Sequence, residues 1–451
     1  MISMSLSTAA SFIDGTLSGL DTTFNGVSID SRSILGSNLF FAIQGDRFDG
    51  HTFIPSVYDQ GAAGAVVENR FENISIPQIE VKNTVQAMAD LAGKWRSQFD
   101  IPVIAITGSN GKTTVKEMVG SILDINAGVL VTRGNLNNHL GVPLTLFELD
   151  DDHKYAVIEM GANHAGDIAG LCDIALPTVA VITQCAPAHL EGFKTEQGVA
   201  QAKSEIFSGL SSNGTAIINA DDKYANLWTQ TAAGLERLYF GIEKRADISA
   251  TNIHFSSKTA ETSFDIQFPD AVISITFSMM GSHNILNSLA AAACCYAMGI
   301  PVSQIKKGLE KVESIPGRME RLTGICDSTI FNDTYNANPS SVEAGLKVLA
   351  EIHGPRWMIF GDMGELGEQA EEFHKLMGKL ARKYGIERLF TVGELSQFSH
   401  DEFGNGGEHF DSTGELLEKV INELSGDITV LVKGSRFMKL EQIVAGLRKG
   451  D

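Results

Sequence analysis

One stretch constrains the fold of this chain more than any other, the run Ile101-Pro-Val-Ile-Ala-Ile-Thr-Gly-Ser-Asn-Gly-Lys-Thr-Thr114. Its apolar first half predicts a buried parallel strand, a glycine-rich turn follows, and a helical pattern begins near Lys112. Gly108 and Gly111 let backbone N–H groups approach phosphate oxygens closely, and the helix N-terminus adds partial positive charge. The stretch therefore predicts a strand–loop–helix unit that binds phosphate.

The spacing of this loop is shorter than in the general phosphate-binding pattern. The first glycine of G-x-x-x-x-G-K-[ST] would fall on Ile106, and the chain instead has T-G-x-x-G-K-T-T. Lys112 supplies a full positive charge, and Thr113 can hold Mg²⁺. A tight turn with an exposed lysine is the alternative, but strand, glycines, lysine, paired threonines and helix all agree with phosphate binding. We expect nucleotide contacts from Gly108, Ser109, Asn110, Gly111, Lys112, Thr113 and Thr114.

Composition narrows the class of protein. A formal net charge of −20 argues against a nucleic-acid partner, which would need a basic face. The five cysteines form no C-x-x-C and no metal-binding spacing, which suits free, mostly buried thiols in a reducing compartment. Residues 1–20 contain no Lys or Arg, unlike a signal peptide, and the most apolar stretch, 289–300, is too short to span a bilayer. We expect a cytoplasmic enzyme without a membrane span.

The first predicted domain, residues 1–98, is a small α/β unit. Strands are expected at 27–30, 38–43, 64–68 and 78–82, and a helix at 84–99 closes the unit. Two polar clusters, 28–32 and 44–51, stand out within it. Composition alone favours turns with solvated charges for both clusters.

The second predicted domain, residues 99–314, carries the phosphate loop and alternates strands and helices. Strands are expected at 101–106, 129–132, 155–160, 178–183 and 214–219, which indicates a mostly parallel, doubly wound sheet. Period-two alternation within 247–280 indicates an antiparallel extension, and a helix is expected at 283–298. Ligands bind beyond the carboxyl ends of such strands, where Glu159, Asn135, Asn137 and Asn138 fall.

The third predicted domain, residues 315–451, begins at the break Pro316-Gly317. Strands are expected at 329–332, 356–360, 388–392 and 428–432, and helices at 340–352, 368–384, 412–424 and 437–448. This pattern is Rossmann-like, but no G-x-G-x-x-G follows its first strand, so a dinucleotide is not indicated. The whole chain is thus predicted as an α/β protein of three domains.

Glu159 is a candidate metal ligand. Mg²⁺ prefers oxygen ligands and is usually held by one or two carboxylates together with phosphates and water. A Glu at the end of a sheet strand is well placed to be that carboxylate. Spacing alone is equally compatible with an ordinary charged strand terminus.

Several motifs, in this order, resemble those of the Mur ligases, which build the peptide stem of bacterial cell-wall precursors and share their central fold with the folylpolyglutamate synthetases. The motifs span essentially the whole chain. They are T-G-S-N-G-K-T-T, the loop Asn135-Leu-Asn-Asn138, Glu159, His189, Lys203, Gly281-Ser-His-Asn284 and Pro316-Gly-Arg318.

Within the family, further segments resemble those ligases that join D-alanyl-D-alanine to UDP-N-acetylmuramoyl-tripeptide in peptidoglycan precursor synthesis. They are Arg47-Phe-Asp-Gly-His51, Gly161-Ala-Asn-His164, Ala188-His-Leu-Glu-Gly-Phe193, Lys203-Ser-Glu-Ile-Phe-Ser-Gly209, Asn332-Asp-Thr-Tyr-Asn-Ala-Asn-Pro339, Gly361-Asp-Met-Gly-Glu-Leu366 and Val432-Lys-Gly-Ser-Arg436. The Asp-Asn-Pro-Arg motif of relatives that add a single amino acid is absent, since Ser340 follows Asn338-Pro339. Thr114 and Met363 are small departures that remove no essential group.

The resemblance implies ATP-dependent amide formation. ATP would phosphorylate the terminal carboxylate of the tripeptide, and the amine of D-alanyl-D-alanine would attack the resulting acyl phosphate. Lys112 would contact the β- and γ-phosphates, Thr113 one Mg²⁺, and Glu159 with His189 a second Mg²⁺. Without the resemblance, His189 would be read as structural, because imidazole is an unusual ligand for a hard ion.

The resemblance changes the interpretation of Lys203 more than that of any other residue. A helical Lys beside Glu205 is ordinarily a solvated surface charge. Mur ligases carry a carbamylated Lys here, which turns a cation into an oxygen ligand for Mg²⁺. That reaction needs the free amine, so a pKa lowered by burial would favour it.

The remaining roles also follow from the resemblance. Asn284, Arg318 and Asp333 would contact the nucleotide from the hinge and the third domain, with Arg318 reaching it on domain closure. Four polar side chains of the third domain would contact the substrate: Asn336, Asn338, Lys433 and Arg436. For Lys433 and Arg436, a pair of solvated charges is nearly as compatible with the sequence. The UDP-sugar positions of the first domain would be Ser28, Arg32, Asp49 and His51, where Arg32 can pair with pyrophosphate.

Two alternatives stay open. Another Mur ligase adding a single amino acid is the nearer one, and a nucleotide-hydrolysing switch protein the more remote. A switch would need neither a UDP site nor Lys203. We expect a monomer.

Overall fold

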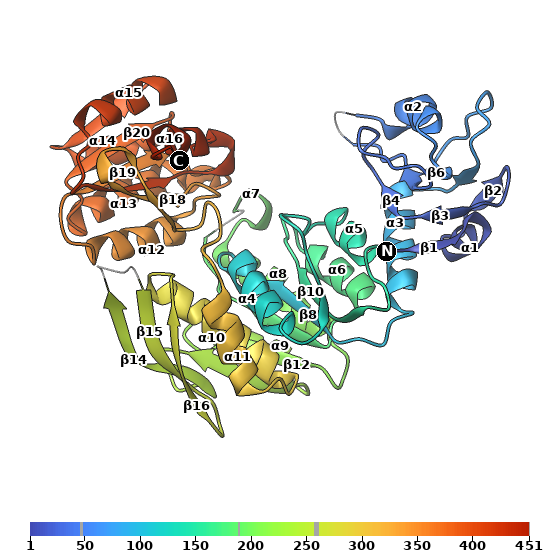
Figure 1. Cartoon of the computed structure of the whole chain (residues 1–451), viewed down its shortest axis with the longest axis horizontal. Coiled ribbons are helices and arrows are strands. Elements are labelled where there is room, and N and C mark those ends of the chain that lie inside the picture. Colours follow the sequence, from blue (N-terminus) through green and yellow to red (C-terminus); the bar gives the residue numbers. More distant parts are fainter. Residues whose placement is uncertain (46–47, 188–189, 257–260, 451) are drawn as a thin grey trace.

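The computed structural model describes residues 1–45, 48–187, 190–256 and 261–450. Three bodies lie in a row, with the central one between an N-terminal body and a C-terminal body (Figure 1). Each body is built on its own mostly parallel sheet with helices against it, which confirms the predicted α/β class. Among the described residues, no helix is long and apolar enough to cross a membrane.

The N-terminal body contains a five-stranded sheet and a two-stranded one. The larger sheet has the order β2 (Thr16–Ser18), β7 (Gln78–Glu80), β6 (Gly64–Val67), β5 (Leu39–Phe41), β4 (Val27–Ser28). The smaller pairs β1 (Ser3–Ser5) with β3 (Thr23–Asn25). The helices are α1 (Leu6–Phe12), the 3-10 turn η1 (Gly50–Phe53), α2 (Ile54–Asp59) and α3 (Thr84–Arg96).

The central body is one nine-stranded sheet. Its order is β16 (Val272–Phe277), β15 (Glu261–Gln267), β14 (Ile248–Ser256), β13 (Glu236–Gly241), β12 (Thr215–Asn219), β11 (Val179–Ile182), β8 (Val103–Thr107), β10 (His153–Glu159), β9 (Gly128–Val131). The strands from β9 to β14 pair in parallel, and β14, β15 and β16 pair antiparallel. The predicted antiparallel extension is therefore confirmed.

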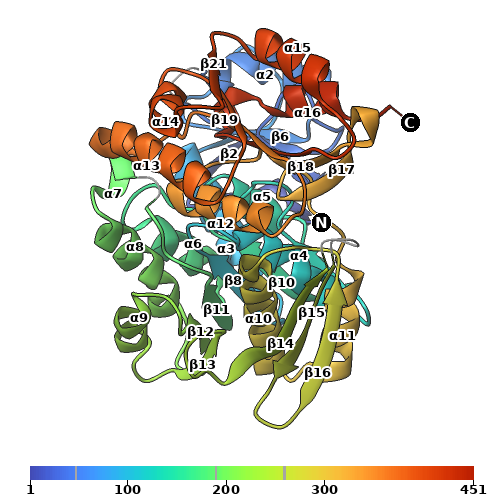
Figure 2. The same ribbon diagram turned by 90° about the vertical axis from the view of Figure 1, so that its left-hand side faces the viewer.

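Helices cover both faces of this sheet (Figure 2). On one face, α4 (Lys112–Leu123) and α10 (Ser282–Ala297) share an apolar cluster with α11 (Val302–Lys311). The helices of the other side are α5 (Gly141–Leu146), α6 (Asp167–Ala175), α7 (Leu190–Phe193), α8 (Glu196–Ser208) and α9 (Ala225–Thr231). All five residues of β8 are buried, because this strand lies between β10 and β11 and under helices on both faces. The phosphate loop thus starts from a fully buried strand inside the sheet.

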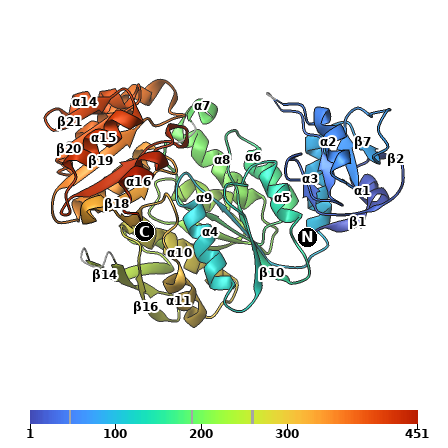
Figure 3. The same ribbon diagram turned by 45° about the horizontal axis from the view of Figure 1, so that its top comes forward.

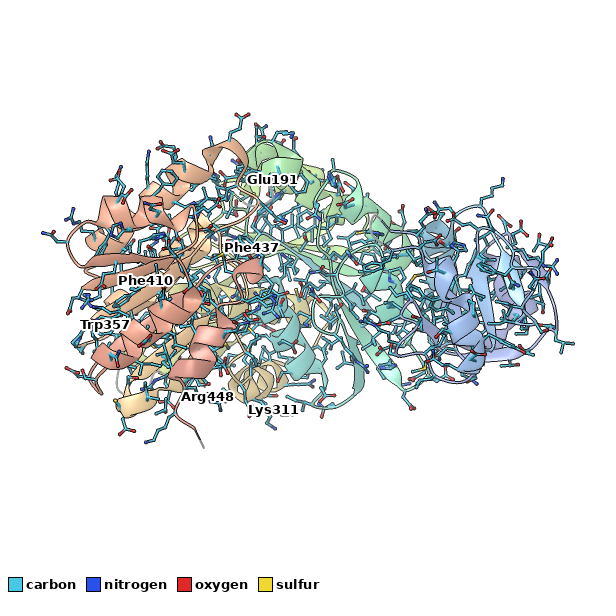
Figure 4. All side chains as sticks on the ribbon, turned by 90° about the horizontal axis from the view of Figure 1, so that it is seen from above. Glu191, Lys311, Trp357, Phe410, Phe437 and Arg448 are labelled. Atoms are coloured by element: carbon cyan, nitrogen blue, oxygen red, sulfur yellow. The ribbon has the colours of Figure 1, made fainter. Side chains whose placement is uncertain are left out.

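The C-terminal body has a six-stranded sheet of order β17 (Glu320–Thr323), β18 (Thr329–Asp333), β22 (Thr429–Lys433), β19 (Arg356–Gly361), β20 (Arg388–Val392), β21 (Gly407–Phe410). Only the pair β17–β18 is antiparallel in it. Its helices are α12 (Pro339–Ala350), α13 (Ala370–Lys383), α14 (Ser396–Phe403), α15 (Thr413–Glu423) and α16 (Glu441–Leu447). Trp357 and Phe410, labelled in Figure 4, mark the side of this sheet that α15 and α16 cover.

Element boundaries depart from the sequence expectations at a few places. The helix expected at 437–448 is a 3-10 turn, Arg436–Met438, followed by α16, because Lys439 adopts a left-handed φ of 52° between them. The helix expected at 84–99 ends at Arg96. The sequence pattern did not indicate several short elements, among them β1, β2, β17, β21, α5 and α14. The predicted domain limits at 98 and 314 stay predictions.

The two junctions of the central body differ. The N-terminal body shares one continuous apolar cluster with it, in which Met88 and Leu91 of α3 join Leu146 of α5 and Leu171 of α6. Arg96 secures this junction, since its buried guanidinium donates to the carbonyls of Ala175, Phe99 and Ile101. The residues after α3 are thereby held at the end of α6.

We expect Arg96→Leu to lower the free energy of unfolding by about 2–4 kcal/mol, because it leaves one buried and two partly buried carbonyls without their donor. Lys94→Leu, two residues earlier on the exposed side of α3, is the matched control and should change it by about 0.5 kcal/mol or less. Urea denaturation of both variants measures this. Equal stabilities of the two would contradict the anchoring role of Arg96.

Candidate active site

The phosphate loop opens into a cavity of about 480 Å³ between the central and C-terminal bodies. Loop residues 109–114 and residues of α10 line it from the central body, and residues of β18, α12 and β22 line it from the C-terminal body. Figure 3 shows α7 at the same boundary, close to the C-terminal body. α7 carries Glu191 (Figure 4), and the N–H of its first residue, Leu190, donates to the carbonyl of Glu365 at 3.0 Å.

The two glycines of the loop are required by close neighbours. A Cβ on Gly108 would lie 1.8 Å from the Thr183 hydroxyl, and one on Gly111 would lie 2.4 Å from Asn287 Oδ1. Gly111 also has a φ of 83° and caps α4, as expected for a glycine at this point. Lys112 Nζ donates to the carbonyl of Gly108 at 2.7 Å, so its charge lies at the mouth of the loop. The predicted strand–loop–helix unit is confirmed as a structure.

The Thr113 hydroxyl is the meeting point of the site. It donates to Glu159 Oε2 at 2.9 Å and accepts from Arg318 Nη2 at 2.8 Å. The second carboxylate oxygen of Glu159 accepts from Asn137 Nδ2 at 2.8 Å. A hydroxyl, a carboxylate and an amide from three separate elements thus converge beside the phosphate loop, and all line the cavity. These are the oxygen donors that Mg²⁺ prefers.

Lys203 lies in the cavity wall, and its residue is only 2% exposed. The expectation of a solvated charge, drawn from its place on a helix beside Glu205, is wrong. Burial, aided by repulsion from Lys112, lowers the pKa of Lys203 to about 7. Among the residues that the structure describes, no side chain forms a hydrogen bond or ion pair with the Lys203 amine.

Glu205, two residues after Lys203, holds α8 against α6. Its carboxylate accepts from the N–H groups of Gly166 and Ala169 at 2.8 and 3.2 Å, near the start of α6. α8 is thereby fixed against α6, with Lys203 turned toward the cavity.

The C-terminal body contributes an amide and a stacked cation. Asn338 and Asn110 exchange side-chain hydrogen bonds of 2.7 and 3.2 Å, although 228 positions separate them. Asn338 also caps α12, accepting from Ser341 N–H. The Arg318 guanidinium lies 4.1 Å from the ring centroid of Tyr335, which orients it toward Thr113.

A buried ion pair completes this wall. Lys433 Nζ contacts Asp333 Oδ2 at 2.6 Å and the Asn336 carbonyl at 3.0 Å. Both charged side chains lie inside the cavity wall, with side-chain exposures of 2% and 13%. Lys433 is therefore the last buried residue of β22 rather than a solvated charge.

Other predicted residues fall at or near the loop. Ser109 exchanges hydrogen bonds with the backbone of Ala186, and Asn284 donates to the carbonyl of Met280 at 2.8 Å. Asn138 caps the start of α5 through Gly141 N–H. The cavity is also lined by Thr114, Asn135 and Asn336.

The first-domain candidates do not line this cavity. Arg32 pairs with Asp30 at 2.8 Å, and Ser28 donates to the carbonyl of Asp30 at 3.1 Å. His51 Nδ1 lies 2.7 Å from Asp49, and Nε2 accepts from Glu68 N–H, so both ring nitrogens are engaged. The contacts of Ser28, Arg32 and Asp49 are those of turns, whereas the His51–Glu68 contact joins η1 to the residue after β6.

Two further candidates are not placed in the cavity. Arg436 is exposed and lies 3.6 Å from Glu441. His189 lies outside the described residues.

Several residues that line the cavity were not among the predicted site residues, and two of them, His283 and Tyr335, bear on its chemistry. His283 lies in the first turn of α10, and burial lowers its pKa to about 4, so its imidazole is neutral. Tyr335 provides the ring under Arg318. The polar run 332–338 could have indicated Tyr335, whereas His283, at the start of an expected helix, gave no sign of burial.

We expect Lys203→Met to stabilise the fold in acid. The pKa of Lys203 in the folded protein, about 7, lies below the ordinary lysine value of 10.5. The buried charge therefore destabilises the fold fully below pH 7 and progressively less as pH rises toward 10.5. The melting temperature of Lys203→Met should exceed that of the wild type most at pH 6, with the difference shrinking above pH 7. Lys223→Met, at an exposed lysine, is the control. A pH-independent difference for Lys203→Met would contradict the shifted pKa.

Three family models match the chain. The Mur ligase family catalytic domain matches residues 23–96, the Mur ligase middle domain residues 106–295, and the Mur ligase glutamate ligase domain residues 317–436. The UDP-N-acetylmuramoyl-tripeptide--D-alanyl-D-alanine ligase of Escherichia coli (strain K12) is 41% identical over 453 residues, covering 100% of this chain and 99% of that one.

Solved structures agree with this finding. A crystal structure of MurF from Acinetobacter baumannii has a TM-score of 0.93 at 34% identity, covering 99% of this chain and 98% of that one. The MurF ligase from Thermotoga maritima, in complex with ADP, has a TM-score of 0.84 at 25% identity, covering 94% and 96%. The resemblance inferred from the motifs is confirmed, and the chain belongs to the Mur ligase family.

Proposed function

We propose that this enzyme joins D-alanyl-D-alanine to UDP-N-acetylmuramoyl-tripeptide, using ATP and an acyl phosphate, in peptidoglycan precursor synthesis. One observation carries the proposal: a phosphate loop and a buried polar wall from the C-terminal body face each other across one cavity. The reaction needs that arrangement, because the nucleotide, the carboxylate that is activated and the incoming amine must meet. The relative in Escherichia coli bears the name of this activity, and the Thermotoga maritima relative binds ADP.

Phosphorylation solves the chemical difficulty of the reaction. A carboxylate is a poor acylating group, so one of its oxygens first takes the γ-phosphoryl group, and ADP leaves. The amine then attacks the carbonyl carbon and forms the new C–N bond. The tetrahedral intermediate loses a proton from its nitrogen and expels inorganic phosphate as the C–O bond to the phosphate breaks. The protein contributes positioning and neutralisation of charge.

Charged side chains of the cavity have distinct parts in this scheme. Lys112 lies at the loop mouth, where the β- and γ-phosphates would bind, and Arg318 approaches the same point from the C-terminal body. Asp333 and Asn284 would complete the nucleotide contacts. The buried Lys433 would face the substrate carboxylate, with Asn336 and Asn338 nearby, whereas the exposed Arg436 would contribute only after movement of the C-terminal body.

The oxygen donors beside the loop fit Mg²⁺. Thr113 and Glu159 would hold one ion, and their hydroxyl and carboxylate already contact each other at 2.9 Å. When bound, Mg²⁺ neutralises phosphate charge and so favours phosphoryl transfer. The second ion is proposed from family resemblance, with Glu159, His189 and Lys203 as its ligands.

Lys203 suits carbamylation. Its free amine would attack CO₂, form an N–C bond and release one proton, which leaves a carbamate with two oxygens. A pKa of about 7 makes the free amine available near neutral pH. Conversion to an anion would also remove the repulsion between Lys203 and Lys112.

The N-terminal body would hold the UDP-sugar through Ser28, Arg32, Asp49 and His51. Arg32 is exposed and could exchange Asp30 for a pyrophosphate oxygen. Both nucleotide substrates belong to the cytoplasm, where we place the enzyme.

The ligation assay tests the proposed function directly. Purified protein with ATP, Mg²⁺, UDP-N-acetylmuramoyl-tripeptide and D-alanyl-D-alanine should release one phosphate for each product molecule, whose mass reports dipeptide addition. Omission of the dipeptide should stop phosphate release. A product carrying one amino acid, or sustained hydrolysis without the dipeptide, would instead support the single-amino-acid ligase or the nucleotide switch.

Carbamylation is tested by Lys203→Ala together with isotope labelling. We expect activity to fall by about 100-fold or more, because a charge-stabilising ligand is lost. In ¹³C-bicarbonate, the wild type should show a protein-bound carbamate signal by NMR that Lys203→Ala lacks. The exposed Lys223→Ala should keep both the signal and the activity. Full activity of Lys203→Ala would refute the assignment.

A further inference from the structure

Lys116 is a buried cation that the proposed reaction does not use. It lies on α4, one turn beyond Lys112, and is 1% exposed. Burying an ammonium group is costly unless hydrogen bonds and an opposite charge compensate. A methionine would fill such a position at a lower cost in free energy. The buried charge of Lys116 therefore indicates a specific role.

The contacts of Lys116 are few and well defined. Its Nζ donates to the Thr132 carbonyl at 2.7 Å and pairs with Glu117 Oε1 at 2.8 Å. The Glu117 side chain is 46% exposed, so this carboxylate keeps much of its hydration. The Thr132 carbonyl is therefore the main buried partner, and it belongs to the residue directly after β9.

Thr132 in turn holds the end of β10. Its hydroxyl accepts from the backbone N–H of Glu159 at 3.0 Å, and its own N–H donates to the Val157 carbonyl at 3.0 Å. Thr132 also precedes the loop that brings Asn137 to the Glu159 carboxylate at 2.8 Å. One buried residue thus fixes the backbone beneath Glu159 and the start of the loop that holds its side chain.

We propose that Lys116 is a positioning residue that acts through Thr132 to hold the Glu159 carboxylate beside Thr113, ready for a divalent cation with its nucleotide. The inference rests on the proposed metal-nucleotide site but not on the identity of the acceptor substrate. Lys116 itself touches neither Glu159 nor Thr113 by any hydrogen bond in the described part of the chain. Its effect is exerted through backbone position.

If Lys116 served only to stabilise the fold, its replacement should have a different effect on nucleotide binding. Removing it would lower stability and would weaken nucleotide binding to the same degree with and without metal. A positioning residue would change the metal dependence of binding and leave metal-free binding alone. Residues that orient metal ligands typically change metal affinity by about 10–100-fold when replaced.

The test measures binding of a fluorescent ADP analogue over a Mg²⁺ series and in EDTA. We expect Lys116→Met to need about 10-fold or more Mg²⁺ for half-maximal binding, with unchanged affinity in EDTA. Lys116→Gln retains a donor for the Thr132 carbonyl and should lose less. Thr132→Val should shift the Mg²⁺ response as Lys116→Met does, and Thr132→Ser should largely restore it.

A double variant tests whether Lys116 and Thr132 act together, and Glu117→Gln serves as the control. The double variant Lys116→Met/Thr132→Val should show a smaller shift than the two single shifts combined, since both break one connection. Glu117→Gln keeps the Thr132 contact and should respond to Mg²⁺ as the wild type does. Should Lys116→Met not fold, as judged by circular dichroism, Thr132→Val carries the same test.

Two results would overturn the proposal: a wild-type Mg²⁺ response in the folded variants, or an equal loss of affinity with and without metal. Failure of the proposed function is recognised separately, because it would appear as an absence of ligation by the wild type while its Mg²⁺-dependent nucleotide binding can still be measured.

Discussion

The hydroxyl of Thr113 is the contact on which the arrangement of the site depends. It joins three parts of the chain, the phosphate loop, the end of β10 through Glu159 and the C-terminal body through Arg318, within 2.8–2.9 Å. A hydroxyl can do this because it donates once and accepts at the same time. The contact with Glu159 holds the phosphate loop against the central sheet, and the contact with Arg318 holds the C-terminal body beside that loop. Mg²⁺ binding to this oxygen would compete with both, so metal and domain position are physically linked.

Three lysines are buried among the described residues, and each has different partners. Lys433 has a full ion pair with Asp333, whereas Lys116 has a carbonyl and a half-exposed carboxylate. Lys203 has neither kind of partner among the described residues, and burial, aided by repulsion from Lys112, lowers its pKa to about 7. A buried amine without a partner is costly as a cation but reactive as a neutral nucleophile. The chemistry proposed for Lys203 is thus a consequence of the contacts that it lacks.

How much could be predicted from sequence depended on whether a property is local. The phosphate loop and Glu159 could be placed because strand, turn and helix signals lie next to each other and strand ends carry ligands. The burial of Lys203 could not, since a helical Lys beside Glu205 looks solvated until α6 and the cavity wall are packed around it. The Asn110–Asn338 pair was equally hidden, because it joins residues from two bodies. Resemblance to a family supplied the role of Lys203, while its local pattern argued against it.

The two junctions of the central body suggest how such a cavity can fill and close. The N-terminal body shares a continuous apolar cluster with the central one, and Arg96 ties three carbonyls at their border. At the C-terminal junction Phe373 packs against the central cluster and Met280 joins the C-terminal one. Polar contacts also cross this junction, Asn110 with Asn338, Arg318 with Thr113, and Leu190 with Glu365. Polar contacts can be exchanged for water or ligand at little cost, whereas separating apolar surface cannot. Motion should therefore concentrate at the C-terminal junction, so that a ligand entering there replaces the very contacts that hold the two bodies together.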